Sequence, residues 1–187
     1  MIVAFSTSSP IASVALITSS GEVVAAAQRE ARMNASGACL ALLEALIFGR
    51  QFEVEGYLAD LGPGSFTGVR VGVTLAKTMA FAHGVQCGGA PAFDLISTKD
   101  LVVVPNKKGE FFWRPVGEAP AIHTELPGES FVGYGTGVEE PRYPLAANFA
   151  PLLASGIQWL QPEALLPRYL VEPSISTPNK PFREGHG

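Results

Sequence analysis

The sequence predicts an α/β protein in which helices cover a mixed β-sheet. Short β-branched and apolar runs open the chain, and turn residues separate them. Two helix-length apolar blocks follow, with another strand-like run between them. Hydrophobic residues make up 47% of the 187 residues, which is enough for a packed core. A helix that joins an antiparallel meander to a returning strand produces a sheet with both parallel and antiparallel neighbours.

The first half of the chain contains the clearest elements. Their expected order is three strands, a helix, a strand and a helix. Gly49 and Gly84 directly follow the two helical blocks, at the position where glycine commonly ends a helix. The expected ranges are Ile2–Phe5, Ala12–Thr18, Val23–Ala27, Ala35–Phe48, Gly56–Leu61 and Thr67–His83.

The second half has shorter patterns because several prolines interrupt it. Its expected order, strands and then a helix, repeats the first half in shortened form. We therefore predict an N-terminal lobe over 1–95, a smaller lobe over 96–172 and an extended or frayed tail over 173–187. The expected elements are a hairpin of Leu101–Val104 and Glu110–Arg114, a strand at Ser130–Tyr134 and a helix at Leu145–Ser155.

Composition narrows the function classes. The chain has 13 Lys and Arg against 17 Asp and Glu, so it lacks the basic surface that would bind nucleic acid tightly by itself. Met1–Gly21 is uncharged but rich in Ser and Thr, and it has no basic leader, so we expect a cytoplasmic protein without a membrane span. Cys39 and Cys87 lack metal-type spacing and are expected to be buried thiols.

The segment from Gly62 to Gly72 joins a predicted strand to a predicted helix, where phosphate-binding loops occur. A Walker A loop requires Lys where this chain has Val69, and a dinucleotide fingerprint requires Gly where it has Thr67, so both motifs are excluded. A nucleophile elbow around Ser65 requires Gly where Pro63 and Thr67 stand. Two interpretations remain: a ligand-binding loop, or a tight turn in which Ser65 or Thr67 caps the helix.

Both long helices carry more apolar or small-residue surface than one sheet covers. Glu44 is the only charged residue in the first helix. In the second helix, small residues recur every four positions and form a ridge that another helix could approach closely. Two interpretations remain for this surface: it is buried within the chain, or it contacts a partner. The ridge consists of Gly68, Gly72, Ala76 and Ala80.

Candidate catalytic groups are sparse. The three histidines are His83, His123 and His186, and they form no His-x-x-x-His pair that would hold a metal on a helix. Most glutamates fall in predicted loops, where solvated charge is the usual role. We therefore expect neither a catalytic residue nor a metal site in this chain.

Several of these segments resemble the TsaB (YeaZ) family, the non-catalytic paralogues of the TsaD/Kae1 family once labelled glycoprotease-like. Similar segments are Ile2–Ser8 with Ser13–Leu16, Arg32–Asn34 and Leu165–Leu170, so the resemblance spans nearly the whole chain. The residues that match the family signature are Gly62, Pro63, Gly64, Ser65, Phe66, Thr67, Gly68, Arg70 and Gly72.

The resemblance implies an actin/Hsp70-like (RNase H-like, ASKHA) fold of two lobes, with the second lobe shortened. It also implies a scaffold that docks on TsaD and activates it, while TsaD transfers threonylcarbamoyl to the adenosine beside the anticodon of tRNA and TsaE supplies an ATPase. tRNA would be met only through the complex. The same helix surfaces also permit a homodimer. The residues implied in docking are Leu40, Leu43, Ile47, Gly68, Gly72, Ala76 and Ala80.

The chain departs from the family pattern at some positions. Ser6 stands where the family usually has Asp, Asn34 where it has His, and Val171 where Arg is common. The resemblance then implies no cofactor in the isolated chain, with ATP or ADP only at the partner interface. The alternative is a small ATP- or phosphate-handling enzyme of the actin-like fold, with Gly62–Gly68 and a phosphate turn of Ser6, Thr7 and Ser8 as its loops.

Overall fold

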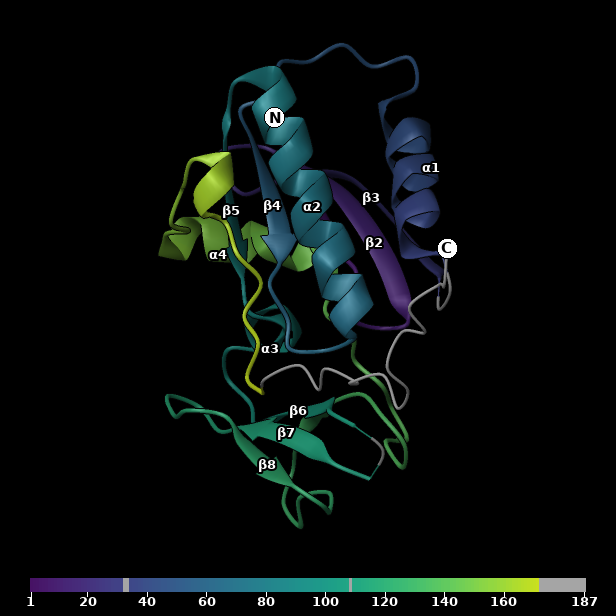
Figure 1. Ribbon diagram of the computed structural model, residues 1–187, viewed down its shortest axis with the longest axis vertical. Helices are drawn as coiled ribbons and strands as arrows, with labels where there is room; N and C mark the ends of the chain where they lie inside the picture. The colour runs from purple at the N-terminus through teal and green to yellow at the C-terminus, as the bar shows by residue number, and fades with distance from the viewer. Residues whose placement is uncertain (32–33, 108, 172–187) are drawn as a thin grey trace, which may run out of the picture.

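The computed structural model describes residues 1–31, 34–107 and 109–171, which form two β-sheets with helices packed around the larger one (Figure 1). The elements of the first half are β1 (Ile2–Ser6), β2 (Ile11–Ile17), β3 (Val23–Glu30), α1 (Ala35–Ile47), β4 (Gly56–Asp60), α2 (Phe66–His83), β5 (Gln86–Ala90) and α3 (Ala92–Ile96). The second half contributes β6 (Val102–Pro105), β7 (Phe111–Arg114), β8 (Ala121–His123), β9 (Val132–Gly133), η1 (Ala146–Asn148), α4 (Phe149–Ser155) and η2 (Pro162–Ala164).

The larger sheet has the strand order β3-β2-β1-β4-β5. β1 and β2 are antiparallel, as are β2 and β3, whereas β4 lies parallel to both β1 and β5. The expected meander, crossover helix and returning strand are therefore confirmed. β1 and β4 occupy the middle of the sheet, and every residue in both strands is buried.

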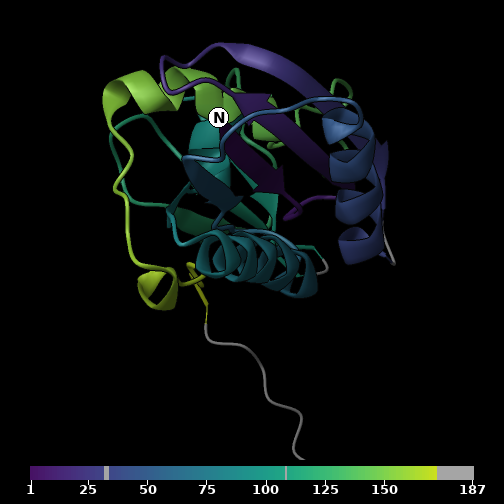
Figure 2. The ribbon, with the colours of Figure 1, turned by 90° about the horizontal axis from the view of Figure 1, so that it is seen from above.

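Helices cover both faces of this sheet, which is why its central strands are apolar throughout. Val3 and Phe5 point toward α1 and α2, whereas Ile2 and Ala4 point toward α4. Seen from above, α2 and α4 lie on opposite sides of the strands (Figure 2).

The smaller sheet has the order β8-β7-β6-β9. β6 and β7 form the expected antiparallel hairpin, and β9 runs parallel to β6. The sheet has a compact core of its own, which includes Phe93 from α3 and Tyr134 from the segment after β9.

Several features differ from the sequence prediction, which included neither α3, β8 nor η2. β5 was not predicted, because its sequence Gln-Cys-Gly-Gly-Ala has low strand propensity. Its glycines are needed for close packing: a Cβ on Gly88 would lie 2.8 Å from the Gln158 carbonyl oxygen. In addition, η1 and α4 pack on the larger sheet and not within a second lobe spanning 96–172, because the open face of that sheet requires an apolar cover. The predicted tail over 173–187 lies outside the described residues.

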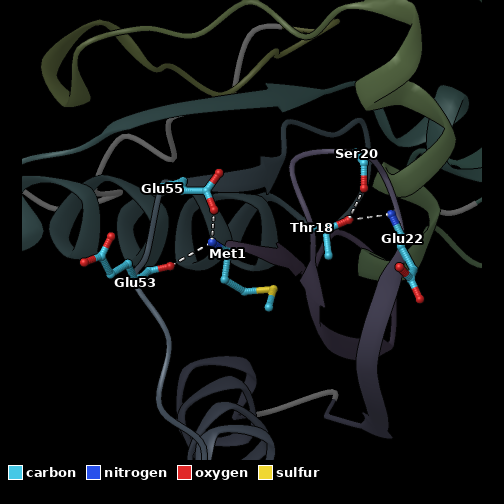
Figure 3. Close-up of polar contacts among 6 residues, drawn as sticks. All are labelled: Met1, Thr18, Ser20, Glu22, Glu53 and Glu55. Carbon is cyan, nitrogen blue, oxygen red and sulfur yellow. Dashed lines mark hydrogen bonds and ion pairs between the residues drawn. The ribbon is translucent and has the colours of Figure 1, made fainter.

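Polar contacts hold the end of the larger sheet near Met1 (Figure 3). The Met1 ammonium donates to the Glu53 carbonyl oxygen at 2.7 Å and to the Glu55 carboxylate. That hydrogen bond and the positive charge of the ammonium lower the pKa of Glu55. In the neighbouring turn, the Thr18 hydroxyl accepts the Glu22 backbone N–H at 3.0 Å and contacts Ser20 at 2.8 Å.

Both cysteines are buried and unbonded, as the sequence predicted. Burial raises the pKa of Cys39 to about 12 and also raises the pKa of Cys87. At pH 8 the thiolate fraction of Cys39 is then on the order of 10⁻⁴. We expect iodoacetamide to leave both cysteines of the folded protein unmodified, and to label both in denaturant, as measured by mass spectrometry. Rapid labelling of Cys39 in the folded protein would contradict its burial.

Candidate functional site

A turn rich in hydroxyl groups follows β1, and it lies beside the end of β4. The two strands are parallel neighbours with Phe5 opposite Ala59, so their next residues, Ser6 and Asp60, come side by side. The Ser6 hydroxyl lies 2.7 Å from Asp60 Oδ2, and the Ser8 hydroxyl donates to the same oxygen. Asp60 Oδ1 accepts the Gly62 N–H at 2.9 Å. One carboxyl group thus connects the turn after β1 to the signature loop, residues 62–72.

Asp60 changes the sequence-based view of this turn. The serine at position 6 was expected to leave the turn without a carboxylate, yet the neighbouring strand supplies one. Asp60 is completely buried, and this burial raises its pKa, although hydrogen bonds from Ser8, Gly62 and Ser6 oppose the rise. The residue was not predicted as a site residue. A signal was present, because a charged residue ends an otherwise apolar strand two positions before Gly62.

The signature loop packs directly against the turn. The Ser65 N–H donates to the Ser8 carbonyl oxygen at 2.7 Å, and the Thr7 hydroxyl donates to the Gly68 carbonyl oxygen at 2.7 Å. Ser65 also caps α2, because its hydroxyl accepts the Gly68 N–H at 3.2 Å. A Cβ on Gly64 would lie 2.2 Å from the Ser8 carbonyl oxygen. The glycines therefore permit a backbone-to-backbone contact that no other residue allows.

A cleft of about 860 Å³ opens between this turn, the start of α1, the signature loop and the smaller sheet. Its walls carry hydroxyl, amide and aromatic groups, and among residues 1–31, 34–107 and 109–171 none of the lining side chains is charged. Thr7 and Ser8 lie on one wall, and Asn106 and Tyr134 on the other. Asp60 does not line the cleft, but it is hydrogen-bonded to Ser8, which does. The cleft thus offers a neutral polar surface beside the N-terminus of α2.

The small-residue ridge of α2 faces the protein's own sheet, which corrects the expectation that it contacts a partner. Ala76 and Ala80 have no exposed surface and belong to the same apolar core as Val3 and Phe5. The other two ridge residues, Gly68 and Gly72, are buried against Thr7. The physical reason is that small side chains let α2 approach the turn after β1 and the sheet closely. Leu43, also expected in docking, is buried on the inner side of α1.

A different part of the helix pair remains apolar and exposed. Leu40 and Ile47 project from the outer face of α1, and Phe48, which directly follows α1, is 86% exposed. Phe81, near the end of α2, is 73% exposed. The two helices lie side by side and run in the same direction (Figure 1). We call Leu40, Ile47, Phe48 and Phe81 the exposed helix surface.

The remaining predicted residues fall into separate groups. Arg70 of the signature stacks over the Phe66 ring at 5.3 Å, and Phe66 contacts Tyr169 of the C-terminal motif, with ring centroids 5.1 Å apart. His83 Nδ1 lies 2.9 Å from the Tyr57 hydroxyl, and His123 stacks on Trp113. His186 and the Arg32–Met33 part of the family motif are outside the described residues.

Across 1–31, 34–107 and 109–171, no group of three or more His, Cys, Asp or Glu side chains is placed to hold a metal ion. In the same ranges, no helix combines the length and the apolar character needed to cross a membrane.

Comparison with known proteins is consistent with the sequence resemblance. Residues 59–96 match the family described as TsaD, tRNA N6-adenosine threonylcarbamoyltransferase. An uncharacterized protein of Mycobacterium leprae is 29% identical over 155 residues, which cover 70% of this chain; the chain spans 42% of that relative's length.

Solved structures of similar fold come from Pseudomonas aeruginosa. One is an uncharacterized protein with similarity to peptidase YeaZ, with a TM-score of 0.72 and 17% identity over 91% of this chain and 99% of that one. Another is YeaZ, with a TM-score of 0.71 and 20% identity over 90% of this chain and 99% of that one. These likenesses confirm the predicted actin-like (RNase H-like) fold.

Proposed function

We propose that this chain is a non-catalytic scaffold subunit that docks on a TsaD-like catalytic subunit and activates it for threonylcarbamoyl transfer to the adenosine beside the anticodon of tRNA. The YeaZ-like fold over nine-tenths of the chain and the match of residues 59–96 to the TsaD family support a role in this system. A TsaE-like ATPase completes the proposed assembly, which is cytoplasmic and meets tRNA only through the complex.

The exposed helix surface is the observation that carries the docking role. Three of its side chains are Phe48, Phe81 and Leu40, and each leaves a large part of its apolar area in water. A partner that covers them recovers roughly 25 cal/mol for each Å² of apolar area buried. Toward the N-terminal ends of the helices, a shallow groove of about 290 Å³ lies between Ser36 of α1 and residues of α2 that include Val71 and Leu75. A second copy of the chain is the other occupant that this surface accommodates.

The docking role predicts that charges on the exposed helix surface prevent assembly. We expect the double variant Leu40→Glu, Phe48→Glu to weaken binding to the TsaD-like subunit at least tenfold. The reason is that two side chains that the partner would bury become charged. Both side chains are exposed in the isolated chain, so its thermal unfolding should change little. Co-purification and calorimetric titration measure the first effect, and circular dichroism measures the second.

A matched control places the same charges elsewhere. Val116 and Ile122 are exposed apolar residues of the smaller lobe, at 53% and 49%. The variant Val116→Glu, Ile122→Glu should bind the TsaD-like subunit normally. Equal binding by both double variants would show that docking uses another surface. Restoration of the tRNA modification in cells depleted of their own scaffold subunit tests the complete function.

The cleft supports a second candidate, a small ATP- or phosphate-handling enzyme. Thr7 and Ser8 of the predicted phosphate turn meet the N-terminus of α2 at the cleft, as a phosphate-binding site requires, whereas Ser6 is buried and does not line it. The lining weighs against it, because the part of the cleft wall that the structure describes carries no cation to balance a triphosphate. Calorimetry with Mg-ATP on the isolated chain separates the candidates, since micromolar affinity favours the enzyme. In the scaffold proposal, ATP or ADP binds only at the partner interface.

A further inference from the structure

The serine hydroxyl groups around Ser6 have too few protons to supply every close oxygen–oxygen contact with a hydrogen bond. Ser6 Oγ lies 2.7 Å from Asp60 Oδ2 and 2.8 Å from the Pro144 carbonyl oxygen. Both of these oxygens are acceptors when Asp60 is ionised, and a serine hydroxyl has one proton to donate. Ser8 gives its own proton to Asp60 Oδ2. One close oxygen pair at Ser6 therefore lacks a proton if Asp60 is a carboxylate.

The missing proton matters because the Pro144 carbonyl group depends on Ser6 for its hydrogen bond. This carbonyl group is buried, and Ser6 is its only hydrogen-bond donor among residues 1–31, 34–107 and 109–171. A buried carbonyl without a donor is strongly disfavoured. If Ser6 donates to Pro144, its oxygen must accept from Asp60, which requires a proton on Asp60 Oδ2. With that proton present, every close pair in the cluster has one donor and one acceptor.

The surroundings of Asp60 favour this arrangement. The carboxyl group has no exposed surface, and burial raises its pKa. The titratable group that faces it is Tyr134, whose hydroxyl donates to the Ser8 carbonyl oxygen at 3.4 Å and whose ring contacts Tyr143. The pKa of Tyr134 is raised by its own burial and then by the nearby Asp60. No cationic side chain contributes to the pKa shift of Asp60 among the described residues.

We propose that Asp60 carries a proton at neutral pH, and that this proton completes a chain of hydrogen bonds from the signature loop through Asp60 and Ser6 to Pro144. The chain joins Gly62, the turn after β1 and the residues that precede η1. Tyr143, next to Pro144, lines the cleft, so the proton holds two of its walls together. When Asp60 loses the proton, Ser6 turns to the carboxylate and Pro144 loses its donor. Asp60 is thus a pH-sensitive latch, by which we mean a group whose proton holds these segments together by hydrogen bonds. This role is independent of the docking role.

A direct test observes the Asp60 carboxyl group in the full chain. NMR titration of the ¹³C-labelled Asp60 side chain should show the carboxylic-acid signal at pH 7, and this signal should be missing from Asp60→Asn. A carboxylate signal at pH 6 to 7 would overturn the proposal. This measurement uses the wild-type protein, so it gives an answer even if the variant is poorly folded.

A second test measures stability against pH. Asparagine can donate to Ser6 and accept from Gly62 at every pH, as the acid form does, but its amide nitrogen cannot accept the Ser8 hydroxyl. That loss is the same at every pH, so the test uses only the change of stability with pH. Below the ordinary aspartate pKa of about 3.9, Asp60 is protonated in both the folded and unfolded states. As pH rises, the unfolded state loses its proton first, so the wild type loses stability relative to Asp60→Asn. The ratio of their unfolding constants should change up to tenfold per pH unit until the folded-state pKa is passed.

The control is Asp100→Asn, which removes an exposed carboxylate that bonds Ser97 in a turn. It measures the effect of deleting one negative charge. A ratio for Asp60→Asn that stays constant between pH 5 and 8, or that follows the control, would mean that Asp60 is ionised in the folded protein, and the latch would be rejected.

Discussion

Replacement of Gly68 by alanine is expected to destabilise the protein by about 3 kcal/mol, the upper part of the range for overpacked sites. The new Cβ would lie 2.0 Å from the Thr7 carbonyl oxygen and 3.1 Å from its carbonyl carbon. Both are backbone atoms, so relief requires α2 or the turn after β1 to move. Such a movement also breaks the 2.7 Å hydrogen bond from the Thr7 hydroxyl to the Gly68 carbonyl oxygen. Urea unfolding at constant pH measures the change.

Gly128→Ala is the matched control for this substitution. A Cβ at Gly128 meets no atom within 4 Å, and its backbone does not have the positive φ that favours glycine. Its effect should stay within about 0.5 kcal/mol. Equal stabilities for the two variants would mean that α2 does not pack on the turn after β1 as described.

Ala76→Glu is expected to cost about 4 kcal/mol or more, which is enough to unfold a protein of ordinary stability. Ala76 has no exposed surface and packs within the core between α2 and the larger sheet. A glutamate there brings a charge into an apolar, closely packed site. Thermal unfolding followed by circular dichroism, together with the soluble yield, measures the loss.

Thr74→Glu provides the comparison, since Thr74 lies on the exposed side of the same helix. It should unfold within a few degrees of the wild type. Normal stability of Ala76→Glu would restore the view that the small-residue ridge faces outward. If Ala76→Glu unfolds, a loss of partner binding in that variant reports loss of the fold. Docking is therefore tested on Leu40 and Phe48, which are exposed in the isolated chain.

The order of elements over the first half was predictable because local patterns specify it. Alternating and continuous apolar runs mark β1, β2 and β4, and Gly84 ends α2 at a φ of 66°. Ser65 as the helix cap was also one of two predicted candidates. β5 escaped prediction because Gly88 and Gly89 are selected by close neighbours and not by strand propensity.

Candidate-site residues were predicted less well than the fold. The repeat of small residues in α2 correctly indicated close packing, but periodicity alone cannot show whether the neighbour is a sheet of the same chain or another protein. The role of Asp60 depends on strand order: only when β4 lies beside β1 does its carboxyl group reach Ser6 and Ser8. The sequence places these residues more than fifty positions apart.

The amino-acid sequence by itself determined the class of fold, the main elements of the first lobe and the signature loop, since these follow from propensity, periodicity and glycine placement along the chain. The tertiary structure decided which face of α2 is buried, that η1 and α4 cover the larger sheet, and that a carboxyl group lies beneath the turn after β1. Those features arise from contacts between distant segments, where the need to bury apolar area and to pair every buried polar group selects one arrangement.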